Sequence, residues 1–137
     1  MRIIYAGLLA GLGMAFVMAF GEWAGLVKIN LPHVNGLFFW KNRFRKPMTY
    51  AFGLSIHLLI SICFALGYVL FRRYIALSWP WALAGLTWAF VLWLAFGLTV
   101  SPVTGYGWFG LKAGKLTWLE LLVTHAVFGL IVSAVMR

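Results

Sequence analysis

The sequence predicts an all-α integral membrane protein, a bundle of four spanning helices. Hydrophobic residues make up 64% of the chain and charged residues only 9%, whereas about 25% of residues in a soluble domain are charged. A chain of 137 residues has room for about four spans, because each spanning helix needs roughly 20 apolar residues. The apolar runs are continuous rather than alternating, which argues against the strands of a membrane barrel.

The predicted helices cover approximately residues 3–27, 49–71, 81–103 and 116–136, within one domain over residues 1–137. The first run starts like a secretory signal, but it is longer than the usual apolar region and lacks a clear cleavage site, so we expect a spanning helix. The long connection over residues 28–48 contains Pro32 and Pro47. The later connections are tight or glycine-rich, so neighbouring helices should run antiparallel in a compact bundle.

An internal repeat relates the two halves of the chain. Residues 9–17 read LAGLGMAFV and residues 83–91 read LAGLTWAFV, and LSIHLL from Leu54 is echoed in the same order by LVTHAV from Leu122. These matches favour a tandem duplication of a two-helix hairpin. Two hairpins that run in the same direction would be related by a pseudo-twofold axis along the membrane normal. His57 and His125 would then lie at similar depth.

Small residues recur at helical spacing around these two histidines. The residues predicted to pack helix against helix are Gly7, Gly11, Gly53, Ser61, Gly85, Gly129 and Ser133. Small residues let helix backbones approach each other in a membrane, and polar side chains avoid lipid, so both imidazoles should point into the bundle. One interpretation is a pair of axial ligands for a b-type haem, or one ligand each for two chlorophyll-type pigments. The other interpretation is a pair of structural hydrogen bonds between helices.

The acidic residues of the chain are Glu22 and Glu120. Both should lie just inside the membrane, on the side that holds the first and third connections, here called the loop side. Ion pairs with Lys28, Lys115 or Arg45 are the expected role. Glu120 and His125 are five residues apart and lack the Glu-x-x-His spacing of di-iron bundles, so no metal site is predicted.

The formal net charge is +9, but the basic residues are spread over membrane-flanking connections, which argues against nucleic acid as a partner. Basic residues are more numerous on the loop side, so the positive-inside rule places that side in the cytoplasm and both termini outside. A basic aromatic segment follows the first span and should contact lipid headgroups or a partner. Its contact residues are Phe39, Trp40, Lys41, Arg43, Arg45 and Lys46.

Four short motifs carry a resemblance. They are LAGL near the start, a connection running from Pro to Gly and Phe, Gly-x-x-x-His followed by FALGY, and a late His-x-x-x-Gly. In these motifs the chain resembles small four-helix bacterial inner-membrane proteins of uncharacterised function. The resemblance implies a four-helix fold and a bacterial inner membrane, and it implies no activity.

No Walker motif, Ser-His-Asp order or CxxC occurs, so we do not expect an autonomous enzyme. The small size and the aromatic, glycine-rich surfaces favour an accessory or assembly subunit of a larger membrane complex, photosynthetic or respiratory. A haem-binding or chlorophyll-binding protein that uses His57 and His125 is the first alternative. A small transporter or channel is the second, and the lack of a polar path across the bilayer weakens it.

Overall fold

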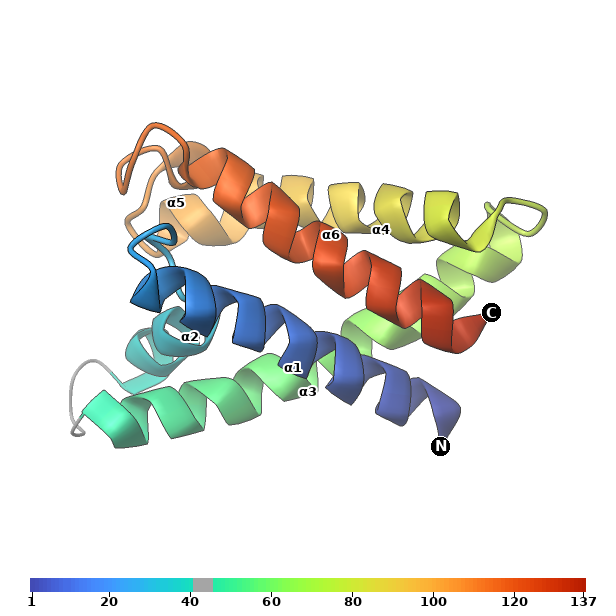
Figure 1. Cartoon of the computed structure of the whole chain (residues 1–137), viewed down its shortest axis with the longest axis horizontal. Helices are drawn as coiled ribbons and strands as arrows, with labels where there is room; N and C mark the ends of the chain where they lie inside the picture. The colour runs from blue at the N-terminus through green and yellow to red at the C-terminus, as the bar shows by residue number, and fades with distance from the viewer. Residues whose placement is uncertain (41–45) are drawn as a thin grey trace.

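The computed structural model describes residues 1–40 and 46–137, and its regular elements there are helices. Four segments are long and apolar enough to cross a membrane: Arg2–Trp23, Pro47–Tyr74, Trp81–Val103 and Thr117–Met136. The prediction of an all-α membrane protein with four spanning helices is therefore confirmed. Both termini lie at the same end of the bundle (Figure 1), here called the terminal side.

The spanning helices are α1 (Arg2–Trp23), α3 (Lys46–Tyr74), α4 (Trp81–Ala95) and α6 (Thr117–Met136). The third span continues beyond α4 as a π-helical turn, η1 (Phe96–Val100), and a short α5 (Ser101–Val103). Pro102 has no N–H to donate within a helix, and a π turn is one way in which a helix accommodates such a break. A 3₁₀ turn, η2 (Trp108–Gly110), lies in the connection that follows.

Helix ends follow from local chemistry. The first span ends at Trp23 rather than near residue 27, and Gly25 then adopts a left-handed φ of 73°, a conformation that glycine adopts without strain. At the end of α3, the Arg72 guanidinium donates to the backbone carbonyls of Ala76 and Trp79. These bonds order the tight turn into α4, which begins directly after Pro80.

The predicted long connection contains a helix of its own, α2 (Leu31–Trp40), that the sequence reasoning missed. Ten residues are too few to span a bilayer, so the segment was counted as a connection. It folds against the first half of α3, where two glycines allow the helices to touch. A side chain at Gly53 would collide with the carbonyl of Pro32, and one at Gly36 with the carbonyl of Thr49.

The bundle is wedge-shaped. Helix α1 packs against α3 and α6, and α6 packs against α4, whereas α3 and α4 have little contact with each other. They meet at the terminal side, where the rings of Phe71 and Trp88 are 5.5 Å apart. From there the two helices diverge toward the loop side (Figure 1), where α2 lies.

The two hairpins are similar but not symmetric. Gly11 of α1 faces Ser61 of α3, and Gly85 of α4 faces Ser133 of α6. A twofold axis would also make the α1–α6 and α3–α4 contacts equal, yet the first is extensive and the second is slight. The duplication of a hairpin stays a prediction, and the present arrangement departs from the twofold bundle it would produce.

Candidate functional site

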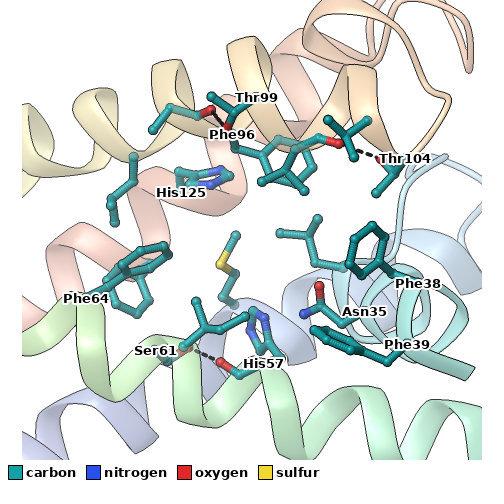
Figure 2. A pocket seen from close by; sticks show the side chains of 18 residues that line it. Asn35, Phe38, Phe39, His57, Ser61, Phe64, Phe96, Thr99, Thr104 and His125 are labelled. Atoms are coloured by element: carbon teal, nitrogen blue, oxygen red, sulfur yellow. Dashed lines mark hydrogen bonds between the residues drawn. The ribbon is translucent and has the colours of Figure 1, made fainter.

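The divergence of α3 and α4 leaves a cavity of about 550 Å³ between them. Helices α1, α2, α3 and α6 and the third span all contribute to its walls, as Figure 2 shows. Most lining side chains are apolar, and Phe64, Phe96 and Phe128 are among the largest. The polar side chains of the lining are Asn35, His57, Ser61, Thr99, Thr104 and His125.

His57 and His125 therefore line the same cavity, on opposite walls (Figure 2), although they come from different hairpins. Their side chains are 5% and 4% exposed. This is the inward orientation that the small-residue spacing around them predicts. The two rings nevertheless have different hydrogen-bond partners.

His125 is held by its own helix. Its Nδ1 lies 2.6 Å from the carbonyl oxygen of Leu121, one turn earlier, and because a carbonyl can only accept, Nδ1 carries the proton. The ring also contacts Phe96, with 5.8 Å between centroids. Within the described part of the chain, Nε2 has no hydrogen-bond partner. A neutral imidazole in this state has a free lone pair at Nε2, the ring atom that faces away from its own helix backbone.

His57 is held by the neighbouring helix. Its Nε2 donates to the carbonyl oxygen of Gly11 on α1 over 3.2 Å, so the remaining lone pair is on Nδ1. The α1–α3 crossing brings Gly11 beside this turn of α3, whereas in the second hairpin Gly85 lies beside Gly129 and Ser133, beyond His125. The different crossing explains why only His57 bonds to the partner helix of its hairpin.

The hydroxyl groups of the lining donate to backbone carbonyls. Thr99 Oγ1 donates to the carbonyl of Ala95 over 2.5 Å, Thr104 to that of Val100, and Ser61 to that of His57. Thr99 lies in the π turn itself. π turns inside α-helices occur frequently at functional sites. This one places Phe96 and Thr99 on the cavity wall beside His125.

Aromatic side chains fill the space between α3 and α4 at the terminal side, beyond the cavity. Trp88 packs over Gly67, and Phe71 contacts Trp88 and Trp79. At the loop side, Phe38 and Phe39 of α2 and Thr104 line the other end. Phe39 is 58% exposed. Helices α3 and α4 are therefore in contact at the terminal side and apart at the loop side.

The two carboxylates lie outside the cavity. Glu22, near the end of α1, accepts a hydrogen bond of 2.6 Å from the Asn30 side chain, and Glu120, in the first turn of α6, accepts one of 2.8 Å from the backbone N–H of Lys28. These bonds order the α1–α2 connection. Among the described residues neither carboxylate forms the predicted ion pair, and no group of three or more His, Cys, Asp or Glu side chains could hold a metal ion.

The predicted headgroup segment is described only in part. Residues 41–45, and with them Lys41, Arg43 and Arg45, lie outside the described residues, as do the side chains of Trp40 and Lys46. Phe39 lies at the loop-side end of the cavity.

The predicted packing residues all lie at helix contacts or are buried. Gly7 faces Ile62, and Gly129 faces Gly85.

Sequence reasoning missed the contributions of α2 and of the π turn. Asn35 lies one turn after Leu31, and both line the cavity. The presence of Thr99 and Pro102 in a continuous apolar run was the available signal, because a polar residue followed by a proline often marks irregular backbone in a membrane helix.

No protein-family model matches the chain, and comparisons with curated proteins and with solved structures found no match either.

Proposed function

We propose that this small multi-pass membrane protein holds one predominantly apolar molecule in the cavity between α3 and α4. The main support for this proposal is that two buried histidines, His57 and His125, line one large cavity. A volume of about 550 Å³ falls within the range of roughly 300 to 1,000 Å³ that is typical of small-molecule sites. Convergent polar groups in an otherwise apolar wall are also typical of such sites.

The route to the cavity follows from its position. The lining consists mostly of aromatic and aliphatic side chains, so a strongly polar solute would lose its hydration there without replacement. An apolar molecule dissolved in the bilayer would lose no such hydration. Entry between the diverging α3 and α4 is therefore the route that we propose.

A tetrapyrrole is one molecule of this kind. His125 suits a single axial ligand, because its Nδ1 is bonded to the carbonyl of Leu121 and metal-binding histidines usually donate their second ring N–H in this way. His57 would first have to give up its bond to Gly11 before its Nε2 could bind a metal. The geometry thus favours one axial ligand over the pair that the sequence suggested.

An accessory or assembly role is the second candidate. The slight contact between α3 and α4 leaves a side of the bundle that a helix of another subunit would complete. A transporter is less favoured, because Trp88 packs against Gly67 and Phe71 between α3 and α4 at the terminal side and the cavity lining offers few polar groups to a solute.

Native mass spectrometry of the gently purified protein tests the proposal. We expect a mass increase corresponding to one bound small molecule. The Ala95→Phe variant should reduce this increase, because Ala95 lines the cavity and a benzyl group there would take up part of its volume. The absorption spectrum of the same sample identifies a tetrapyrrole, and a bound mass in the protein range supports the accessory role.

Ala19→Phe is the matched control. Ala19 is exposed on α1 and is not among the lining residues, so this variant should retain the bound molecule. A wild-type protein that is stable and carries no bound mass would contradict the proposal. If Ala95→Phe retained as much of the bound molecule as the wild type, the cavity would not be its binding site.

A further inference from the structure

The polar atoms that line the cavity have an unusual balance of donors and acceptors. His125 uses its N–H on Leu121, and His57 uses its N–H on Gly11. The hydroxyl protons of Ser61, Thr99 and Thr104 are used on backbone carbonyls. What these five side chains still offer to an occupant is lone pairs.

Asn35 is the exception among the polar side chains of the lining. Its amide has two donor hydrogens and one acceptor oxygen, and it lies on α2 with Phe38 and Phe39, at the loop-side end of the cavity. In Figure 2 Asn35 lies beside His57 and away from His125, so the part of the cavity around His125, Thr99 and Thr104 is the part lined by acceptors. A hydrogen-bond acceptor placed there by an occupant would remain unpaired, and an unpaired buried polar group is costly.

We propose that the cavity selects apolar molecules that carry a hydroxyl group, such as phenols, quinols or long-chain alcohols, and that the hydroxyl donates to Nε2 of His125. This inference rests on the proposed function and narrows it to one chemical class. His125 is the better acceptor of the two histidines, because its free nitrogen is the distal ring atom. In His57 the free Nδ1 is the ring nitrogen next to its own backbone.

A matched pair of probes tests this selection. The probes are 4-decylphenol and its methyl ether, which share an apolar body and differ in one donor hydrogen. An equimolar mixture is added to the purified protein, and native mass spectrometry reports the ratio of the two bound forms. We expect the phenol to exceed the ether roughly fivefold after correction for partitioning into detergent, because one hydrogen bond contributes about 1 kcal/mol.

Two histidine variants locate the acceptor. In His125→Phe the preference for the phenol should vanish while the ether still binds, because the ring is kept and the lone pair is lost. His33→Phe is the matched control, since His33 lies on α2 and does not line the cavity; the preference should persist there. Loss of the preference in His33→Phe as well would overturn the assignment to His125.

The possible results of the probe experiment distinguish a failure of the hydroxyl selection from a failure of the proposed binding function. Equal binding of phenol and ether to the wild type would overturn the selection for hydroxyl groups and leave the cavity as a binding site. Binding of neither probe, in a protein that carries no other molecule, would overturn the proposed function itself. The wild-type comparison needs no variant, so it decides the question even if His125→Phe does not fold.

Discussion

At the scale of single residues, Ser101 shows how one side chain orders the end of the cavity. Its side chain is buried, with no exposed area. The hydroxyl donates to the carbonyl of Gly107 over 2.6 Å and accepts from the N–H of Gly110 over 2.8 Å. Between these partners, Phe109 adopts φ 51° and lies against Trp93, with 4.7 Å between centroids. Ser101 thus ties the connection after the third span to the π turn that holds Thr99.

The Ser101→Ala variant should lower the free energy of unfolding by about 1 to 3 kcal/mol, because it leaves the buried N–H of Gly110 without its acceptor. Denaturation of the protein from mixed micelles measures this change. Ser78→Ala is the control, since Ser78 is exposed in the α3–α4 connection, and it should be close to neutral. A loss of similar size in both variants would show that the hydroxyl of Ser101 has no specific role.

The histidines illustrate what the sequence does and does not determine at this scale. Their burial follows from the cost of an imidazole in lipid and from the small residues around them. Their hydrogen bonds do not follow, because these depend on the crossing point of each hairpin. A shift of one helical turn brings Gly11 within reach of His57 but leaves Gly85 beyond His125. Equal spacing in two repeats therefore does not predict equal chemistry.

At the scale of elements, the α2–α3 contact is the structural support of the loop-side end. Gly36 and Gly53 bring the two backbones so close that any side chain would meet a carbonyl. Phe38 and Phe39 take their positions at the cavity from this contact. Close backbone approach through small residues is a general way to hold membrane helices together.

The Gly53→Ala variant should destabilise the protein by about 1 to 3 kcal/mol, because overpacking against a backbone carbonyl forces the two helices apart. Gly13→Ala is the matched control. Its added methyl group would meet only the flexible end of the Ile131 side chain, and replacing glycine within a helix by alanine favours the helix by up to about 1 kcal/mol. Equal destabilisation by both substitutions in the same denaturation assay would contradict the tight α2–α3 crossing.

The spanning helices could be predicted from the sequence, because each is a long apolar run and a bilayer admits few alternatives. Helix α2 could not, since a segment of ten residues carries no spanning signal and its fold depends on contact with α3. The π turn was not predicted either, although Thr99 and Pro102 were a weak signal for it. Thr99 and Pro102 interrupt the run chemically, but the residues that surround them remain apolar and the hydropathy of the span stays high.

At the scale of the whole molecule, the order of helix packing produces the cavity. Helices α1 and α6 pack along each other in the middle, and each also binds one outer helix, α3 or α4. Among the described residues the outer helices have slight contact with each other, around Trp88 and Phe71. A symmetric four-helix bundle would have closed this side and filled it with side chains. The asymmetry is the feature that leaves room for the molecule we propose the cavity to bind.

The most direct test of this account is a crystal structure of the protein grown from a lipidic mesophase without removal of bound molecules. We predict that α3 and α4 diverge toward the loop side and that non-protein electron density lies between them, in contact with His125. A structure in which α3 packs against α4 along its whole length, with side chains filling the space between His57 and His125, would contradict the account.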